Sequence, residues 1–465
     1  MALRRTGTSC TSRLRKVEVR DCALVVSAVL SATLLLYIHL LDLHQQTTIS
    51  SPAPPSGPLP LHHLLFSIAS SSASIHSRAS YIRVWHAPIS RLNTTFLFLD
   101  RPPPQPQPAA SLPPIIISPN ASSRHIGHRI ARVVRDAVAL DVPGIYWYVF
   151  GDDDTLLFTE NIARILSKYD HNQWYYIGCN SESYEQNDKF YFDMAFGGGG
   201  YAISAPLARV LAQVLDSCLN RNAHLYGSDA RIFSCLAELG VQLTVEQGFH
   251  QVDVRGNLHG LLSAHPLSLM ASLHHIDAVD PIFSFMSRTE SLEHLFKAVS
   301  LDPARIFQQT VCYDANSLIT VSASWGYAVE IYEGNQHLPE LLSFQRSFRP
   351  WKRGKNVASS RFMFNMREYP NDPCKRPVVF FLHSAVRDTD GVWTNYTRHE
   401  ARNCTRAKVI EKFKVVRVFS PVVRFDMEQM KAPRRHCCVI SSSSDEDITI
   451  QIRNCGIFEL IAMRG

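Results

Sequence analysis

The chain lacks the charge excess and the cysteine spacing that mark two large classes of protein. Its formal net charge of +6 is concentrated at the amino end, where residues 1–21 hold six basic and two acidic side chains. The other 444 residues therefore carry only +2, which leaves no basic footprint of the kind expected for nucleic-acid binding. No Cys-x-x-Cys pair is present either, so zinc modules built on that spacing are disfavoured.

One long uncharged run follows the basic tail directly. Cys22–Leu41 contains no formally charged side chain, and about twenty apolar residues suffice to cross a bilayer. Basic residues on its amino side predict a cytosolic tail (1–21), a transmembrane signal anchor (22–43) and a lumenal body. A cleaved signal peptide is the alternative, but the run exceeds the usual length of about 7–15 residues and no clear Ala-x-Ala site follows. We therefore expect a single-pass type II membrane protein.

Glycosylation sequons and cysteines agree with a lumenal body. Nine of the eleven cysteines lie beyond the predicted anchor, and an odd number cannot pair completely within one chain. Disulfides are the better interpretation of most of them, with the pairing left open. Four Asn-x-Ser/Thr sequons would be surface acceptors in a secretory compartment, at Asn93, Asn120, Asn395 and Asn403.

The body divides by composition and by hydrophobic period. Residues 44–60 are rich in proline, serine and threonine and predict an extended stem. Residues 61–285 alternate buried strands with helices, which predicts an α/β domain. Residues 286–465 contain short β-prone runs and six of the nine lumenal cysteines, which predicts a smaller β-rich domain. The expected strands are 64–69, 95–99, 145–150, 318–321, 327–332 and 378–382, and the expected helical stripes are 162–169, 207–218 and 232–239.

Three consecutive aspartates follow the expected strand at 145–150. Side chains alternate along extended backbone, so Asp152 and Asp154 can point the same way and reach one divalent cation, with Asp153 facing elsewhere. In an open α/β sheet, the carboxyl end of a strand is where nucleotides bind. An acidic, solvated turn is the alternative interpretation of such a triplet.

Four segments in order carry chemistry: GDDDT (151–155), FGGGGYAIS (196–204), LYGSDAR (225–231) and GFHQ (248–251). With these segments, and with blocks such as SLHHIDAVDPIF (272–283), the chain resembles the plant fringe-related family. That family is similar to the fringe β-1,3-N-acetylglucosaminyltransferases. The resemblance runs from about residue 64 to the end of the chain. It implies a GT-A-like nucleotide-sugar-binding domain before the β-rich part.

The resemblance also implies roles for individual residues. Asp154 would bind Mn²⁺ (Mg²⁺ is the alternative ion), together with Asp152 and with the imidazole of His250. Asp152 and Asp153 would lie near the ribose and sugar of a UDP-sugar. The tetraglycine Gly197, Gly198, Gly199 and Gly200 would form the active-site wall, where glycine lets backbone approach a ligand closely. A lone histidine is otherwise usually structural, and a glycine run is otherwise a flexible turn.

Asp229 is the candidate catalytic base, which would take a proton from the acceptor hydroxyl. Its alternative role is that of an acid favoured by the helix dipole in a first helical turn. Plant relatives typically read Gly-Ser-Asp-Asp-Arg here, whereas this chain has Ala230 as the second member. Either Asp229 is the base, or the missing carboxylate is and activity is weakened.

The expected function is that of a Golgi type II membrane glycosyltransferase with a lumenal catalytic body. It would transfer a hexose or N-acetylhexosamine from a UDP-sugar to a glycan or glycoprotein acceptor, with inversion and in a β-1,3 linkage. The alternative is a catalytically silent member that binds glycans or partner proteins. A carboxylate–metal hydrolase would leave the glycine loop and the anchor unexplained. No nucleic-acid partner is expected.

Overall fold

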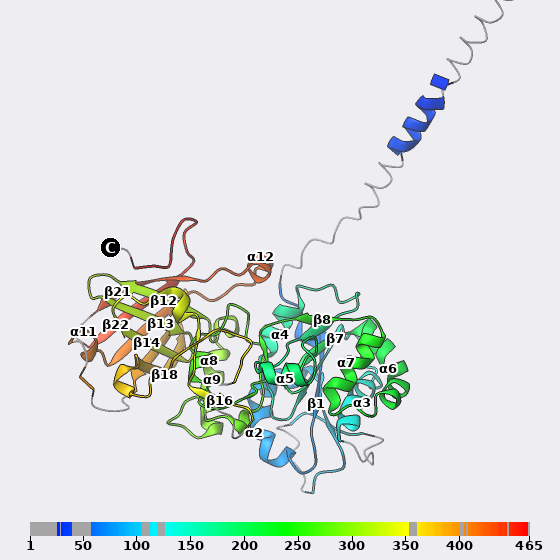
Figure 1. The fold of residues 1–465 in the computed structure, drawn as a ribbon, viewed down its shortest axis with the longest axis horizontal. Coiled ribbons are helices and arrows are strands. Elements are labelled where there is room, and N and C mark those ends of the chain that lie inside the picture. The colour runs from blue at the N-terminus through cyan, green and yellow to red at the C-terminus, as the bar shows by residue number, and fades with distance from the viewer. Residues whose placement is uncertain are drawn as a thin grey trace, which may run out of the picture. The chain divides into compact units, whose positions relative to one another are not determined.

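The computed structural model describes residues 26–27, 29–39, 57–104, 112–118, 126–352, 360–399, 404–405, 408–443 and 446–463. The chain divides into two units, Met1–Ser56 and Gly57–Gly465. In the first unit, residues 26–27 and 29–39 are helical and exposed (Figure 1). Of the helices that the structure describes, none is both long and apolar enough to span a membrane. The predicted tail, both ends of the predicted anchor and residues 44–56 of the predicted stem lie outside the described residues.

A seven-stranded mixed sheet organises the first part of the second unit, with strand order β3-β2-β1-β4-β7-β6-β8. Strands β3, β2, β1 and β4 are parallel, and β7 runs antiparallel to both of its neighbours. The strands are β1 (Leu64–Ala69), β2 (Thr95–Leu99), β3 (Ile115–Ile117), β4 (Trp147–Asp152), β6 (Tyr176–Gly178), β7 (Tyr201–Ser204) and β8 (Leu243–Val245). The helices of this part are α2 (Ile75–His86), α3 (Ile126–Val138), α4 (Thr159–Leu166), α5 (Tyr184–Lys189), α6 (Ala205–Arg221) and α7 (Ser228–Glu238).

Helices cover both faces of this sheet because its central strands are apolar on both faces. All six residues of β1 are buried, and successive residues point to opposite sides. Leu65 packs into a core built with α3, α6 and α7, whereas Phe66 packs into the core that contains α2 and α4. The sheet is therefore the middle layer of a three-layer arrangement.

The carboxyl ends of β1 and β4 meet at one point of this sheet. Ala69, the last residue of β1, is paired with Asp152, the last residue of β4. The chain continues from β1 to β2 on one side, while β4 lies on the other side of β1. Such a reversal of strand order opens a crevice at the strand ends, where ligands bind in α/β sheets. The aspartate triplet begins in this crevice.

A group of short elements joins the first sheet to the carboxyl-terminal part. Helix α9 contacts α2 on one side and β18 on the other, and Figure 1 shows α8, α9 and β16 between the two large sheets. The pairs are β5-β11-β9, β10-β16 and β15-β17. The elements are β5 (Leu156–Leu157), β9 (Phe249–His250), β10 (Val254–Gly256), α8 (His259–Leu262), β11 (Ser272–Leu273), α9 (Arg288–Val299), α10 (Leu338–Leu341), β15 (Phe344–Gln345), β16 (Phe348–Pro350) and β17 (Met366–Arg367).

An eight-stranded, barrel-like sheet forms the carboxyl-terminal part, with order β12-β13-β14-β18-β19-β20-β22-β21. Its end strands β12 and β21 contact each other and are joined by the disulfide Cys312–Cys438. The elements are β12 (Gln309–Asp314), β13 (Ile319–Ser324), β14 (Ala328–Glu333), β18 (Val378–Arg387), β19 (Val392–Arg398), α11 (Lys408–Glu411), β20 (Val415–Ser420), α12 (Met427–Lys431), β21 (Cys437–Ser443) and β22 (Asp447–Arg453).

Eight of the nine cysteines beyond residue 41 form disulfides. The pairs are Cys218–Cys235, Cys312–Cys438, Cys374–Cys404 and Cys437–Cys455. Cys179 is the remaining one, and it is the free cysteine of the described residues. The expected disulfides with one leftover thiol are therefore confirmed.

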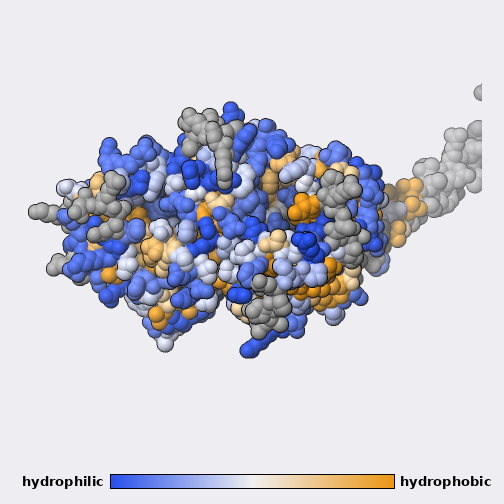
Figure 2. All heavy atoms as spheres, turned by 90° about the horizontal axis from the view of Figure 1, so that it is seen from below, coloured by the Kyte–Doolittle hydropathy of each residue, from blue (hydrophilic) through white to orange (hydrophobic). Residues whose placement is uncertain are grey.

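Seen from below, the surface is mainly hydrophilic with scattered hydrophobic patches (Figure 2).

The mixed α/β architecture and the β-rich carboxyl-terminal part are as the sequence predicted, whereas a GT-A-like first domain and a transmembrane helix stay predictions. The expected strands 64–69 and 95–99 coincide with β1 and β2, and the helical stripe 207–218 lies within α6. The stripes 162–169 and 232–239 begin in α4 and α7 and run past the ends of these helices, at Leu166 and Glu238. The expected strand 145–150 lies two residues further along, as β4. The boundary at residue 285 stays a prediction, because residues 57–465 form one compact unit.

Candidate active site

The aspartate triplet lies at the carboxyl end of β4, where a hydroxyl holds the turn. The Thr155 hydroxyl accepts a hydrogen bond from the backbone N–H of Asp152 (3.0 Å) and donates one to the carbonyl of Gly198 (2.8 Å). The strand end and the tetraglycine loop are therefore joined through one buried side chain. This joint fixes where Asp152 and Asp154 point.

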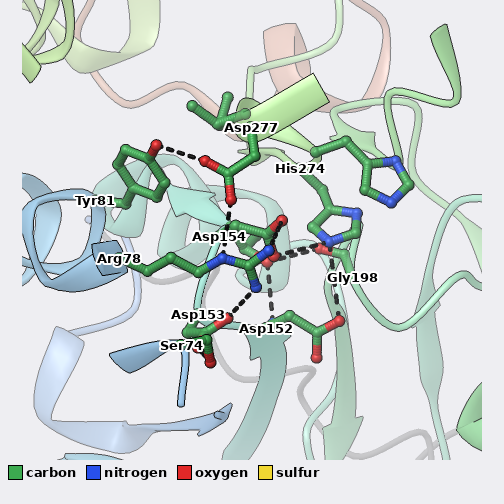
Figure 3. A network of polar contacts seen from close by, with 12 residues as sticks. Ser74, Arg78, Tyr81, Asp152, Asp153, Asp154, Gly198, His274 and Asp277 are labelled. Atoms are coloured by element: carbon green, nitrogen blue, oxygen red, sulfur yellow. Dashed lines mark hydrogen bonds and ion pairs between the residues drawn. The ribbon is translucent and has the colours of Figure 1, made fainter. Parts of the chain in front are cut away.

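Two of the three carboxylates converge with an imidazole. Oxygens of Asp152 and Asp154 and a ring nitrogen of His274 all lie within 4.8 Å of one another. The Nε2 atom of His274 is 3.2 Å from Asp154 Oδ1 and 3.8 Å from Asp152 Oδ2 (Figure 3). The side chain of Asp152 is 34 % exposed and that of Asp154 is 6 % exposed, so Asp152 is the member open to a ligand from solvent.

The structure places His274, not His250, beside the aspartates. The His250 ring instead contacts Glu182 Oε1 (3.1 Å) and His265 Nε2 (2.9 Å). The reason lies in the strand register. His250 is paired with Leu273 in the parallel strands β9 and β11, so His274 is one residue out of step and faces the other way. His250 therefore does not lie with the two carboxylates, and His274 takes its place as the candidate imidazole ligand.

Asp153 turns away from the other two carboxylates, as the alternation of side chains predicts. Its oxygens accept hydrogen bonds from Ser70 (2.7 Å), Ser74 (2.5 Å) and the Arg78 guanidinium (2.5 Å), and the residue is 2 % exposed. A carboxylate engaged by three protein donors has little capacity left for a ligand. Asp153 therefore has an internal role beside the amino end of α2, and its expected contact with a ribose or sugar stays a prediction.

Arg78 of α2 joins three carboxylates at this site. Its guanidinium lies 2.5 Å from Asp153, 3.2 Å from Asp154 and 3.0 Å from Asp277 (Figure 3). Asp277 in turn accepts a hydrogen bond from the hydroxyl of Tyr81, at 2.6 Å. One cation therefore balances part of the negative charge and anchors the wall of the site opposite His274.

The carboxylates differ in their protonation. Burial raises the pKa of Asp152 to about 7, against the opposing charge of His274 and with help from neighbouring carboxylates. Burial would also raise the pKa of Asp154, but His274 and Arg78 outweigh it and lower that pKa to about 2. Burial lowers the pKa of His274, and the two carboxylates raise it above its ordinary value overall. Asp154 is therefore the stronger acid of the two carboxyl groups, and Asp152 is the weaker one.

The tetraglycine loop packs directly on the functional side chains. A Cβ added to Gly197 would lie 2.5 Å from Asp229 Oδ1, and one added to Gly198 would overlap the His274 ring. The amide of Gly199 donates to the side-chain oxygen of Gln251 (2.6 Å), and Ser272 donates to the Gly199 carbonyl. Glycine is therefore required here by protein groups that approach the backbone. Contact of the loop with a sugar stays a prediction.

Asp229 shares a small pocket with Asp152 and Gly197. Its carboxylate accepts a hydrogen bond from Ser228 (2.8 Å), and the Gly197 backbone also holds it. Burial raises the pKa of Asp229, while Ser228, Gly197 and His274 oppose the rise. A carboxylate with a raised pKa at a pocket wall has the properties of a general base.

Ala230 points away from this pocket. It is 3 % exposed and packs in an apolar cluster with Met194 and Phe196. A carboxylate at this position would meet those two side chains and not the pocket of Asp229. In this chain the geometry therefore favours Asp229 as the base candidate.

Sequence reasoning assigned no role to His274, Arg78, Tyr81 or Asp277. For His274 and Asp277, the available signal is the His-His-x-Asp spacing in residues 274–277, inside the block SLHHIDAVDPIF. The signal for Arg78 and Tyr81 is weaker, because an arginine and a tyrosine one turn apart on a helix are common. Only the tertiary structure, which brings α2 beside the aspartate triplet and Asp277, shows what they contact.

Two family descriptions match the chain, and each covers more than half of it. The first is "Fringe-like", over residues 60–296, and the second is "Protein of unknown function, DUF604", over residues 186–438. No curated protein matches. Among solved structures, "a glycosyltransferase involved in the glycosylation of the major capsid of PBCV-1" covers 50 % of this chain and 98 % of its own, with 14 % identity and a TM-score of 0.26. That similarity is too low to carry an argument. The two family matches confirm the resemblance: the chain belongs to the fringe-related glycosyltransferase family.

Proposed function

We propose that this chain is a metal-dependent, inverting glycosyltransferase that uses a UDP-sugar. It transfers a hexose or N-acetylhexosamine to a glycan or glycoprotein acceptor, in a β-1,3 linkage. The observation that carries the proposal is the convergence of Asp152, Asp154 and His274 at the strand-order reversal of a fringe-related fold, with Asp229 on the wall of the same crevice.

The donor set fits a divalent cation. Two carboxylates are the hard oxygen ligands that Mg²⁺ and Mn²⁺ prefer, and one imidazole favours Mn²⁺. Nδ1 of His274 is buried without a hydrogen-bond partner among the described residues, so the ring is held by its contacts on the Nε2 side and by packing. We assign Asp152, Asp154 and His274 to the metal. When bound, the cation would act as a Lewis acid on the charge of a departing UDP.

The protein groups around the metal site have separable tasks. Asp229 takes the proton of the acceptor hydroxyl, while Ser228 and the Gly197 backbone orient its carboxylate. His274 and then Arg78 keep Asp154 ionised, as the depressed pKa of that carboxyl indicates. The Gly198 backbone seats the His274 ring. Relatives carry a carboxylate where this chain has Ala230, but this position packs in an apolar cluster and does not face the pocket of Asp229. We therefore propose an active enzyme and not a catalytically silent member of the family.

The charge change Asp154→Asn tests the metal assignment with little change in size. The full chain should bind UDP in a Mn²⁺-dependent way and hydrolyse or transfer its donor slowly. The Asp154→Asn variant should lose the Mn²⁺ dependence. Asp188→Asn is the control, because it removes the same charge from an exposed position of α5. Equal Mn²⁺-dependent UDP affinity in all three proteins would remove the metal site from the proposal.

We also propose that the body lies in the Golgi lumen behind an uncleaved anchor at residues 22–43. The sequons and the four disulfides support this location, because N-glycans are added and disulfides form in the secretory pathway. Glycosidase treatment of the expressed chain should increase its gel mobility, and amino-terminal sequencing should find residues 1–21 intact. A chain without glycans in the cytosol would refute the location.

A further inference from the structure

A wide groove lies on the part of the fold that joins the two sheets, and its charge is strongly one-sided. It measures about 670 Å³ and is formed by the chain around β16, β17 and the segment up to residue 376. Four arginines line it against a single carboxylate. The charged and aromatic lining residues are Arg346, Arg349, Arg367, Arg376, Glu368 and Tyr369.

Two of these arginines have no side-chain partner among the residues that the structure describes. Within the described part of the chain, neither Arg346 nor Arg349 makes a side-chain hydrogen bond or an ion pair. Arg349 is exposed and Arg346 is half-buried. By contrast, Arg367 is held inward by the Tyr332 hydroxyl at 2.7 Å, and Arg376 lies over the Tyr369 ring at 4.1 Å. The groove therefore combines two anchored and two uncompensated guanidinium groups.

A chain of contacts connects this groove to the candidate active site. Arg349 is paired with Arg255 across strands β16 and β10. The Arg255 guanidinium lies 4.1 Å from the centre of the Trp351 ring, and Trp351 stacks on His275 at 4.0 Å. His275 directly follows His274 of the proposed metal site. A line of contacts from Arg349 through Arg255, Trp351 and His275 therefore connects the groove to that site.

The chemistry of the groove selects an extended anion. Guanidinium groups bind carboxylates through paired hydrogen bonds in fixed geometry, and arginine is the preferred residue for that recognition. Several arginines along an open groove match charges that repeat along a chain better than a single compact anion. The diphosphate of a donor would be neutralised at the proposed metal site, which leaves the groove for the other substrate.

We propose that this groove binds an acidic oligosaccharide, with uronate carboxylates facing Arg346 and Arg349, as the acceptor of the reaction. The assignment as acceptor rests on the proposed transferase function. The binding of the acidic chain does not.

The test measures binding of short oligomers to the full chain. The probes are an oligomer of galacturonic acid and a neutral oligomer of galactose of the same length. The acidic oligomer should bind, with an affinity that falls as salt rises, and the neutral one should bind much more weakly. The double variant Arg346→Gln/Arg349→Gln should weaken the acidic oligomer by about tenfold or more, because two charged hydrogen-bond donors are lost.

The control removes the same charge elsewhere. Arg424 and Lys431 are exposed and line a different hollow, so Arg424→Gln/Lys431→Gln should leave the affinity unchanged. Equal weakening by both double variants would overturn the proposal, since only overall charge would then matter. Equal binding of the neutral oligomer, or full competition by inorganic phosphate at the concentration of the oligomer, would overturn it as well.

Mn²⁺-dependent UDP binding, measured on the same preparations, separates this proposal from the transferase proposal. The Arg346→Gln/Arg349→Gln variant should bind UDP as the unmodified chain does. A chain that binds UDP but not the acidic oligomer refutes the groove alone. A chain that binds the oligomer but no UDP refutes the transferase function and leaves the groove in place.

Discussion

Replacing His274 or His250 by glutamine separates a metal ligand from a structural histidine. The two rings are comparably buried, at 5 % and 6 % exposure; His250 ends β9, and His274 directly follows β11, the strand paired with β9. Only His274 lies with Asp152 and Asp154. Loss of a group that merely orients a ligand costs about 10–100-fold in metal affinity, so loss of the ligand itself should cost about 100-fold or more. That is about 3 kcal/mol of binding free energy.

His250→Gln should instead affect folding. Its ring contacts Glu182 and His265, and the substitution leaves the Glu182 carboxylate, 7 % exposed, short of a partner. An unsatisfied buried group costs about 1–3 kcal/mol or more when it is charged, so the melting temperature should fall while Mn²⁺ affinity stays the same.

The assay is a Mn²⁺ titration of the full chain in the presence of UDP, followed by the signal of free Mn²⁺ in electron paramagnetic resonance. Thermal unfolding of the same samples reports stability. The reasoning fails if His250→Gln weakens Mn²⁺ binding as much as His274→Gln does, or if His274→Gln binds Mn²⁺ with unchanged affinity.

Three further changes test other parts of the structure. Ala230→Asp buries a carboxylate against an apolar cluster and should lower stability by about 3–5 kcal/mol without raising transfer, so a stable and more active variant in melting and activity assays would contradict the assignment of Asp229. Replacing Cys312 and Cys438 by serine opens a link across 126 residues and should lower the unfolding free energy by about 4–5 kcal/mol, measured in denaturant. Burial would raise the pKa of Glu330, but His259 outweighs it and lowers that pKa to about 2, against an ordinary value of 4.5. Its ionised form therefore stabilises the fold above pH 4.5, and this contribution, about 3 kcal/mol, should disappear as the pH falls to 2. The stability difference from Glu330→Gln should shrink over that window, and a constant difference would argue against it.

The sequence predicted those parts of the fold that local chemistry determines. β1 and β2 coincide with short apolar runs bounded by polar residues, and α6 follows a stripe with Pro206 in its first turn. Asp152 and Asp154 were predicted as a pair because alternation along a strand is local. Asp153 was expected to face elsewhere for the same reason, but its partners at and before the start of α2 lie about 80 residues away in sequence.

What the sequence left open depends on register and on long-range packing. The choice between His250 and His274 is decided by a one-residue offset between two parallel strands that are 22 residues apart. The disulfide pairing is similar. Cys437 and Cys438 are adjacent in β21, so they point to opposite sides and reach Cys455 and Cys312 respectively. No spacing rule distinguishes these partners before the strands are placed.

The unpaired Cys179 has a consequence for the other eight cysteines during folding. Disulfides rearrange when a thiolate attacks an existing bond, so a ninth thiol in an oxidising compartment is a source of mispairing. Burial raises the pKa of Cys179 to about 12. At neutral pH, only about one molecule in 10⁵ would then carry the thiolate, since each unit of pKa above the ambient pH reduces it about tenfold. Once the first sheet has formed around it, this residue therefore holds little of the thiolate that would attack the four native bonds.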